Sequence, residues 1–277
     1  MAYLVTGDAE RAGGRSIVFA ASNPKDIYGR EKPGRHKIAG MPDGRRIPRY
    51  DSAQAVRELS AADAKLGELI RRTGPFTLRL KSAHSPFEAL LESIVYQQLN
   101  GRAAAAILRR VLELSGGFHP SPQAILDTPD EPLRGAGLSG NKLRALRDLA
   151  AKTLDGAVPT LERIRRMPDE EIISRLTEVR GIGQWTVEML LMFRLGRPDV
   201  LPVTDYGVRK GFLLTFQRKN AFTSERFGGT KPVAAEDLPK PDVMLRRAEK
   251  WRPWRSVASW YLWRACDLHA KKQEQPE

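Results

Sequence analysis

Apolar residues recur at intervals of three and four along most of the chain after Asp51, which is the period of an amphipathic α-helix. The positions that carry this pattern are Val56, Leu59, Leu66, Leu69 and Ile70; Phe87, Leu90, Leu91, Ile94 and Val95; Leu143, Leu146 and Leu149; Ile172, Ile173, Leu176 and Val179; and Val187, Leu190 and Leu191. Residues 102–114 and 206–216 are also predicted helices. Residues 76–80 alternate and predict either a short strand or an extended link. A chain of helices with almost no strand predicts an all-α fold.

Residues of the kind that begin helices precede several of these segments. The run Ser85-Pro86-Phe87-Glu88 is a capping box, in which Ser85 accepts from a first-turn amide and Glu88 reaches back to a free amide. Ser121, Ser139 and Asp169 are likewise predicted to cap the helices that follow them.

Two segments lack the helical pattern. Residues 1–50 hold ten Lys or Arg and five Asp or Glu, with many Gly and Pro, and only residues 16–20 favour a short strand. We interpret them as a flexible basic extension that either touches phosphates or is a solvated tail. Residues 217–240 are polar and predict a loop insertion. The expected organisation is therefore this extension, residues 1–50, followed by one helical domain, residues 51–277.

The charge balance narrows the class of partner. The chain has 46 Lys and Arg against 33 Asp and Glu, a net charge of +13, which favours a polyanion such as nucleic acid. Cys266 is the single cysteine, so an intrachain disulfide and a four-cysteine zinc or iron–sulfur site are excluded. We find no secretory signal and no apolar run of bilayer length, and therefore expect a cytoplasmic protein without membrane contact.

The most informative segment is Leu176-Thr-Glu-Val-Arg-Gly-Ile-Gly-Gln-Trp-Thr186, which predicts two amphipathic helices joined by a tight turn. Gly181 and Gly183 allow positive φ and close backbone approach, and Ile182 between them fills the gap between the helices. The free amides at the start of the second helix form a seat for a phosphate. The alternative is a helix corner that binds nothing.

At this point the sequence resembles a known family. The segment ending in Val179-Arg-Gly-Ile-Gly-Gln-Trp-Thr186 is similar to the helix-hairpin-helix of the DNA glycosylase superfamily named for that motif, and residues 201–210 are similar to its catalytic-aspartate segment. The nearest branch is the 3-methyladenine DNA glycosylase II type, which residues 94–99, 137–143 and 251–257 also match. The resemblance covers about residues 52–270. It implies two helical subdomains around a cleft.

The resemblance makes Asp205 the expected catalytic residue, although its position alone favours an ordinary helix N-cap. In the superfamily this carboxylate faces the sugar of the extruded nucleotide, where it stabilises oxocarbenium-like charge or orients the attacking water. Related bifunctional enzymes place a lysine nucleophile two residues after the second hairpin glycine. That position is Trp185 here, so we expect no lyase step.

The base pocket that the resemblance implies is aromatic. Trp185 and Trp263 are expected against the flipped base, where an indole face attracts a cationic alkylated purine. Tyr96 is a weaker candidate. The helical wheel places Trp263 beside the core stripe of the last helix, on a face shared with Trp260. The alternative for each ring is ordinary core or hairpin packing.

The resemblance also implies DNA contacts outside the pocket. Leu99 matches the wedge that fills the space of the flipped base, and Gln98 is placed to bond base edges. The other expected DNA-binding residues are Gly181, Ile182, Gly183, Gln184 and Thr186. A structural Na⁺ or K⁺ ion is expected at the backbone carbonyls of Thr177, Val179 and Gly181, and no cofactor is required.

The function that follows is a monofunctional base-excision-repair glycosylase that hydrolyses the N-glycosidic bond of alkylated purines such as 3-methyladenine in duplex DNA. The expected partner is damaged double-stranded DNA, bound by a monomer in the cytoplasm, at the nucleoid if the source is bacterial. Two alternatives stay open. One is a helix-hairpin-helix module that binds DNA without catalysis, and the other is a glycosylase for oxidised or mismatched bases.

Overall fold

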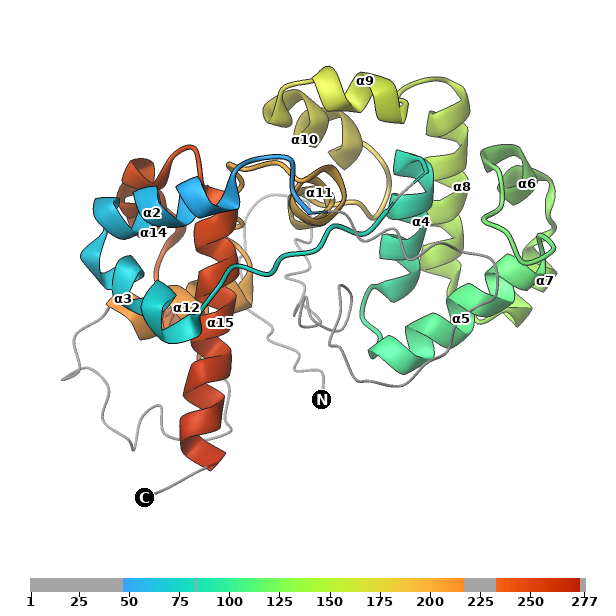
Figure 1. Cartoon of the computed structure of the whole chain (residues 1–277). Coiled ribbons are helices and arrows are strands. Elements are labelled where there is room, and N and C mark those ends of the chain that lie inside the picture. Colours follow the sequence, from blue (N-terminus) through green and yellow to red (C-terminus); the bar gives the residue numbers. More distant parts are fainter. Residues whose placement is uncertain (1–46, 83, 217–232, 275–277) are drawn as a thin grey trace. The chain divides into compact units, whose positions relative to one another are not determined.

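The structure, a computed structural model, describes residues 47–82, 84–216 and 233–274, with side chains up to residue 270 (Figure 1). Its regular elements are helices, so the predicted all-α fold is confirmed for this part of the chain. Residues 76–80 form an extended link between helices. Most of the basic extension, with its short strand, and most of the 217–240 insertion lie outside the described residues.

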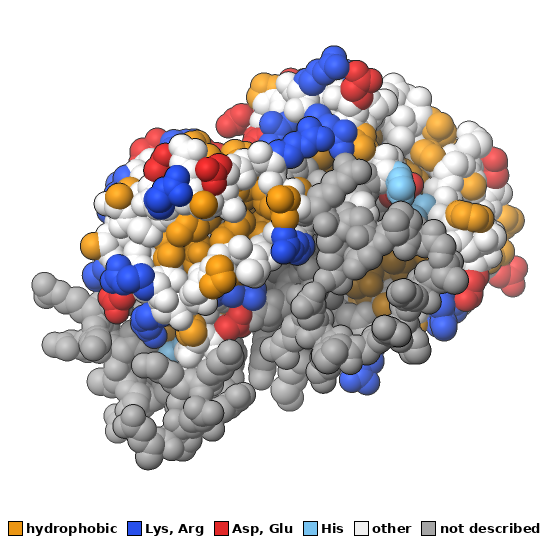
Figure 2. All heavy atoms as spheres, in the orientation of Figure 1, with side chains coloured by type: hydrophobic (Ala, Val, Ile, Leu, Met, Phe, Trp, Pro, Cys, Tyr) orange, Lys and Arg blue, Asp and Glu red, His pale blue; other side chains and the backbone are white. Residues whose placement is uncertain are grey.

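The described chain divides into two compact units. Residues 81–195 form the middle unit, named for its place in the sequence, and residues 47–80 with 196–274 form the outer unit. On the face shown in Figure 2, Lys and Arg side chains lie on both units, with acidic side chains among them. Among the described helices, none is both long enough and apolar enough to cross a membrane.

The middle unit is built around one long helix, α8. Its helices are α4 (Pro86–Tyr96), α5 (Gly101–Glu113), α6 (Pro122–Asp127), α7 (Asp130–Gly135), α8 (Gly140–Leu154), α9 (Leu161–Arg166), α10 (Asp169–Thr177) and α11 (Gln184–Leu190), which continues into a π-helical turn (Leu191–Leu195). Helices α4, α6 and α7 pack on α8, and α10 packs on α11. Leu90 and Ile94 of α4 and Leu146 and Leu149 of α8 are fully buried. Each such side chain stabilises the unit by about 1.5–3 kcal/mol.

The predicted helix starts are confirmed in part. The hydroxyl groups of Ser121 and Ser139 accept from first-turn amides, as expected. Ser85 Oγ also accepts from the amide of Glu88 at 3.1 Å, but the Glu88 carboxylate accepts from His84 N rather than from Ser85 N. The predicted capping box is therefore only half formed. The prediction for Asp169 was wrong, because Pro168 is the N-cap and Asp169 is the first residue of α10. A carboxylate there still favours the helix, since it faces the positive end of the dipole.

The outer unit is built around the last helix. It contains α2 (Ser52–Ala62), α3 (Ala64–Thr73), α12 (Tyr206–Phe216), α14 (Pro241–Ala248) and α15 (Arg255–Glu274), with 3₁₀ turns at Ala235–Asp237 and Glu249–Trp251. Helix α15 packs along α12 and also contacts α2 and α3. Val257, Tyr261 and Leu262 of α15 are fully buried, so this helix supplies much of the core.

One buried carboxylate joins three elements of the outer unit. Asp63 lies between α2 and α3, where Oδ1 caps α3 by accepting from the amides of Lys65 and Leu66. The same carboxylate accepts two bonds of 2.9 Å from Arg247 of α14, a bond from Trp251 Nε1 and an ion pair with Lys250 at 3.1 Å. Burial would raise the pKa of Asp63, but the bonds from Arg247 and Lys250 outweigh it, and the net pKa lies below its ordinary value.

The first prediction concerns Asp63→Asn. We expect the free energy of unfolding at neutral pH to fall by about 2 kcal/mol, because the fork to Arg247 loses its charge. The folded pKa is depressed, so this stabilisation is present above the ordinary carboxyl pKa and is lost as pH falls through the lower folded value. Urea titrations of both proteins, repeated down the acid range, should show the difference shrinking below about pH 4.

The matched control is Asp242→Asn on α14, where an exposed carboxylate pairs with Arg246 one turn away. That change should lower stability by less than about 0.5 kcal/mol. Equal losses in the two variants, or a difference that grows in acid, would contradict the account of Asp63.

Candidate active site and nucleic-acid interface

The hairpin between α10 and α11 turns through a single left-handed residue. Gly181 has φ of 77°, while Gly183 has φ of −98° and is the N-cap of α11. The expectation that both glycines serve positive φ is therefore half correct. A Cβ on Gly183 would meet no atom within 4 Å, so this glycine leaves open space beside the start of α11. Ile182 is buried, which agrees with the prediction that it fills a gap in the hairpin.

Helix α8 holds the hairpin in place. The Asp148 carboxylate accepts from the amide of Arg180 at 2.7 Å and from Lys152 at 2.9 Å, and Lys152 also donates to the Glu178 carbonyl. Burial would raise the pKa of Asp148, but the bonds from Arg180 and Lys152 lower it below its ordinary value. The carboxylate thus stays charged and fixes the turn at neutral pH.

The loop that carries the predicted wedge joins α4 to α5. Gln98 has φ of 58°, a left-handed conformation uncommon outside glycine, and its side chain is exposed. Leu99 follows and is half-buried. Asn100 then caps α5 by accepting from the amide of Ala103. Backbone strain of this kind gathers at binding and catalytic sites, which suits a loop that presents Leu99.

The same loop is fastened to the hairpin and to α8. Gln97 Nε2 donates to the Gly181 carbonyl at 2.8 Å, and Lys142 Nζ donates to the Val95 carbonyl at the end of α4 at 2.7 Å. Burial lowers the pKa of Lys142 to about 8. Neither residue was among the expected site residues. Their signal in the sequence is that Gln97 lies in the matching segment 94–99 and Lys142 in the matching segment 137–143.

The remaining candidates of the middle unit lie on α4 and α11. Tyr96 ends α4 and is half-buried, and burial raises its pKa. Trp185 is half-buried on the first turn of α11. Gln184 is exposed and donates to Glu188 one turn later, while Thr186 is buried. Of these first-turn side chains, Gln184 is therefore the one most open to solvent.

Asp205 lies in the outer unit at the start of α12. Its Oδ1 accepts from the amide of Val208 at 2.8 Å, the geometry of an N-cap. The same oxygen accepts from the indole Nε1 of Trp263 on α15, also at 2.8 Å. The carboxylate is fully buried. One carboxylate oxygen of Asp205 thus makes both the N-cap bond and the predicted contact with a tryptophan.

Two glycines on α12 make this contact sterically possible. A Cβ on Gly207 would lie 2.6 Å from Cδ1 of Trp263, and one on Gly211 would overlap the backbone carbonyl of Leu262. The two residues are one helical turn apart and face α15, so α12 lies directly on the backbone of α15. The spacing is visible in the sequence, but its partner helix is not.

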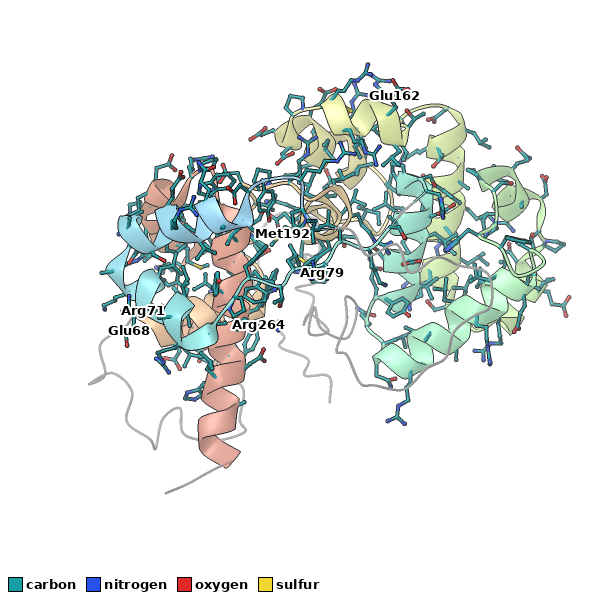
Figure 3. All side chains as sticks on the ribbon, viewed as in Figure 1. Glu68, Arg71, Arg79, Glu162, Met192 and Arg264 are labelled. Atoms are coloured by element: carbon teal, nitrogen blue, oxygen red, sulfur yellow. The ribbon has the colours of Figure 1, made fainter. Side chains whose placement is uncertain are left out.

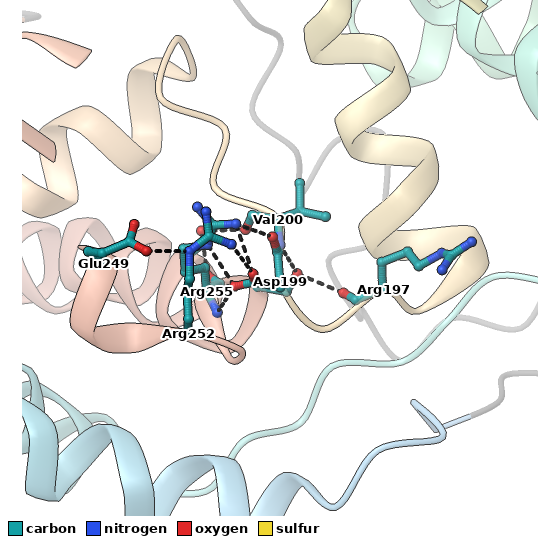
Figure 4. A network of polar contacts seen from close by, with 8 residues as sticks. Arg197, Asp199, Val200, Glu249, Arg252 and Arg255 are labelled. Atoms are coloured by element: carbon teal, nitrogen blue, oxygen red, sulfur yellow. Dashed lines mark hydrogen bonds and ion pairs between the residues drawn. The ribbon is translucent and has the colours of Figure 1, made fainter. Parts of the chain in front are cut away.

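The segment that leads to Asp205 is clamped by the start of α15 (Figure 4). Arg255 forks onto Asp199, with Nε to Oδ1 at 2.6 Å and Nη2 to Oδ2 at 2.8 Å, and Arg252 adds a bond to the same carboxylate. Ser256 Oγ donates to the Arg197 carbonyl and accepts from the Val200 amide. These bonds fix both ends of residues 197–200, a few residues before Asp205.

Trp263 is buried more deeply than a pocket wall would require. Trp260 and Trp263 expose only 7% and 5% of their surfaces, so the face of α15 beside the core stripe is covered as well. Arg264, labelled in Figure 3, places its guanidinium 5.2 Å from the Trp260 ring. The alternative in which these rings extend the core is therefore realised for Trp260, while Trp263 also holds Asp205.

The structure brings the expected residues together in two groups. Asp205 and Trp263 are in direct contact in the outer unit. The hairpin, the wedge loop, Tyr96 and Trp185 belong to the middle unit. The cleft and the grouping of both indole rings around Asp205 stay predictions.

Comparison with known proteins identifies the family. The sequence model of the HhH-GPD superfamily base excision DNA repair proteins matches residues 91–226. DNA-3-methyladenine glycosylase 1 of Schizosaccharomyces pombe is 35% identical over 217 residues, which cover 78% of this chain and 88% of that protein. The chain belongs to the HhH-GPD superfamily. The resemblance seen in its motifs is confirmed.

Solved HhH-GPD structures share the fold. The S. pombe 3-methyladenine DNA glycosylase in complex with abasic DNA aligns with a TM-score of 0.63 at 33% identity, covering 76% of this chain and 95% of that one. The DNA-3-methyladenine glycosidase of Bacillus halodurans gives 0.67 at 32% identity, covering 79% and 91%. The matched HhH-GPD region contains the wedge loop, the hairpin and Asp205.

The second prediction concerns the close approach of α12 to α15. Gly211→Ala should lower the free energy of unfolding by about 3 kcal/mol, because the new methyl group overlaps backbone that cannot rotate away. An alanine in a helix is otherwise favoured over glycine by about 1 kcal/mol. Gly135→Ala in α7, where a Cβ meets nothing within 4 Å, is the control and should leave stability unchanged or slightly raised. Equal urea midpoints for the two variants would refute this packing.

Proposed function

We propose that this protein is a monofunctional DNA glycosylase that hydrolyses the N-glycosidic bond of alkylated purines, 3-methyladenine among them, in duplex DNA. The observation that carries the proposal is the bond between Asp205 and the indole of Trp263, since it joins an anion to an electron-rich ring. The names of the relatives, several of them 3-methyladenine glycosylases, support the substrate class.

The chemistry requires a fixed anion. Cleavage of an N-glycosidic bond builds positive charge on the sugar, and a carboxylate held beside it stabilises that charge and orients the attacking water. Asp205 is suited to this role because two donors, one from α12 and one from α15, hold its Oδ1 in place. An anion that is already oriented needs no reorganisation when the charge develops.

Burial of Asp205 sets a condition on this mechanism. The carboxylate has no exposed surface, so the extruded nucleoside reaches it only when the groups that cover it move apart. Binding of the duplex would have to drive that opening, so that the flipped nucleoside can enter. Trp263 then has two uses in the proposal, since its ring edge holds Asp205 while its face can meet a cationic base.

The absence of a lyase step belongs to the same proposal. Bifunctional relatives place a lysine two residues past the second hairpin glycine, and Trp185 occupies that position on α11. An indole cannot form a Schiff base with the sugar. The expected product is therefore an intact strand with an abasic site.

The hairpin and the wedge loop would hold the duplex. Open space at Gly183 lets a phosphate approach the first amides of α11, and Leu99 would fill the gap left by the flipped base. The carbonyl oxygens of Val179 and Gly181 each accept one hydrogen bond, from Ile182 N and Gln97 Nε2. A carbonyl oxygen has two lone pairs, so these two oxygens keep one each for a Na⁺ or K⁺ ion, which we propose they would hold together with the carbonyl of Thr177. We propose that a monomer acts this way, in the compartment that holds the DNA.

Base-release assays separate this proposal from its alternatives. Duplexes containing 3-methyladenine, 7-methylguanine, 1,N6-ethenoadenine, hypoxanthine or 8-oxoguanine form a suitable panel. Release of the alkylated purines, with strands left uncut until alkali is added, is the expected result. DNA binding without release of any base would favour a non-catalytic module, and preference for 8-oxoguanine would favour the oxidised-base class.

The third prediction is that Asp205→Asn abolishes base release while duplex binding persists. The amide can still accept from Val208 N and Trp263 Nε1, so the fold is kept, but the charge that stabilises the sugar cation is lost. Single-turnover base release should fall at least about 100-fold, equivalent to about 2.7 kcal/mol in the barrier. Asp242→Asn, the same change at an exposed position of α14, should release base at the parent rate. Undiminished release by a folded Asp205→Asn protein would remove the assignment.

The fourth prediction makes Arg255 a positioning residue. Arg255→Lys removes the fork onto Asp199 and loosens the segment before Asp205, so the single-turnover rate should fall about tenfold with little change in duplex affinity. Arg252→Lys, which alters a more exposed partner of the same carboxylate, should have less effect. A purely structural role would instead lower stability and leave the rate of the folded fraction unchanged.

A further inference from the structure

A basic cavity lies next to the hairpin, wholly within the middle unit. Its volume is about 590 Å³, and it opens between α7, the first three to four turns of α8 and hairpin residues 178 and 180. Its basic lining residues are Arg134, Arg144, Arg147, Lys152 and Arg180. We call this cavity the basic hollow. None of its residues is among those assigned to base recognition or catalysis above.

Half of the charges in the basic hollow neutralise one another. Arg147 pairs with Asp130 at 2.7 Å, and Lys152 pairs with Asp148 at 2.9 Å. Arg147 also donates to backbone carbonyls at the end of α6, so it serves the fold. These two cations are therefore already engaged.

Three other cations remain, and of these Arg180 lies close enough to Asp148 to help lower the pKa of that carboxyl. Arg134, Arg144 and Arg180 are exposed, and Glu178 is the remaining acid of the lining. Within the described chain, the guanidinium groups of Arg134 and Arg180 have no ion pair or hydrogen bond. Unpaired arginines that converge on one cavity are suited to an anion, because their fork matches phosphate oxygens.

The start of α8 adds to this positive potential. This 15-residue helix begins at Gly140, which lines the basic hollow, and its first turn contains no acidic residue. Asn141 Oδ1 accepts from Arg144 Nη2 at 2.6 Å, and a Cβ on Gly140 would lie 3.7 Å from Arg144 Nη1. The Arg144 guanidinium therefore lies over the positive end of the helix dipole, and both favour the same anion.

The place of the basic hollow indicates which anion it binds. Arg180 lines it and is also the residue before Gly181, so the hollow adjoins the turn that holds DNA in the proposed function. A lining dominated by charged groups does not suit an apolar ligand, which needs mostly apolar walls. A DNA strand carries one phosphate for about every 3.4 Å of rise, so a strand seated on the hairpin has a further phosphate within reach.

We propose that the basic hollow binds a DNA backbone phosphate next to those held by the hairpin. It would raise the affinity for the duplex without contacting any base. Arg134, Arg144 and Arg180 are the phosphate ligands, and the first turn of α8 contributes its dipole. The inference rests on DNA binding in the proposed function, but not on the chemistry at Asp205.

The test compares the parent with Arg134→Ala/Arg144→Ala. Fluorescence anisotropy with a duplex that contains a tetrahydrofuran abasic analogue gives the Kd at several salt concentrations. We expect the Kd to rise about tenfold and the slope of log Kd against log salt to fall by about 1, because one phosphate that the variant no longer neutralises lowers the slope by about 1. The weakening should be the same for duplexes of different sequence.

The matched control is Arg163→Ala with Arg109→Ala, which removes two exposed arginines of the same unit, on α9 and α5, outside the basic hollow. This control should leave the salt slope near the parent value. Equal effects in both double variants would assign the change to overall charge and overturn the proposal. Binding of inorganic phosphate at the hollow with no change in duplex affinity would also overturn it, and would assign the hollow to a free anion.

Base release separates this inference from the proposed function. Under saturating single-turnover conditions the Arg134→Ala/Arg144→Ala protein should still release 3-methyladenine and leave the strand uncut, at a rate no more than about tenfold below that of the parent, because Asp205 and Trp263 are unchanged. If the Arg134→Ala/Arg144→Ala protein binds the duplex as tightly as the parent and still releases base, the phosphate site is refuted and the proposed function is not. A parent protein that binds duplex but releases no base refutes the proposed chemistry and leaves the phosphate site standing.

Discussion

The hydrogen bond from Trp263 to Asp205 sets the arrangement of the outer unit around its candidate site. An indole N–H reaches that carboxylate only if α12 lies against α15 at backbone distance, which Gly207 and Gly211 permit. The position of α15 is fixed in turn, because the bonds of Arg255 and Ser256 fasten its start to residues 197–200. A buried carboxylate is unfavourable unless hydrogen-bond donors surround it. The Val208 amide, the Trp263 indole and the two glycines of α12 therefore depend on one another.

Helix α8 has the corresponding role in the middle unit. On the side facing the hairpin, Asp148 holds the Arg180 amide and Lys152 holds the Glu178 carbonyl. Nearer its start, Lys142 holds the end of α4, from which the wedge loop begins. The wedge loop and the hairpin are thus carried by one rigid element and joined through Gln97. The two loops are therefore already ordered relative to each other before DNA binds. This lowers the conformational entropy that is lost when a duplex contacts both of them.

The sequence predicted the parts of this site whose signal is local. Helical periodicity, the Gly-Ile-Gly turn and the aspartate segment were sufficient for the fold class and the family, because each depends on neighbouring residues. Pairings over long sequence distances were not accessible. Nothing in the adjacent residues Gln97 and Gln98 shows which one reaches the hairpin, and the helical wheel of α15 could not reveal that its second face is also covered. The prediction that Asp169 caps α10 was wrong because Pro168 adopts the N-cap conformation, although it makes no side-chain hydrogen bond.

Burial of Asp205 connects stability with the proposed chemistry. Away from water, a charge on the carboxylate acts on a developing sugar cation through a low effective dielectric, where each interaction is stronger than in solution. The same surroundings keep the carboxylate covered until a nucleoside arrives, so part of the binding energy of the duplex must be used to open the site. Under the proposed function, contacts of the hairpin and the basic hollow with the DNA backbone would supply that energy. The basic hollow would then contribute to opening the site, although it contacts no base.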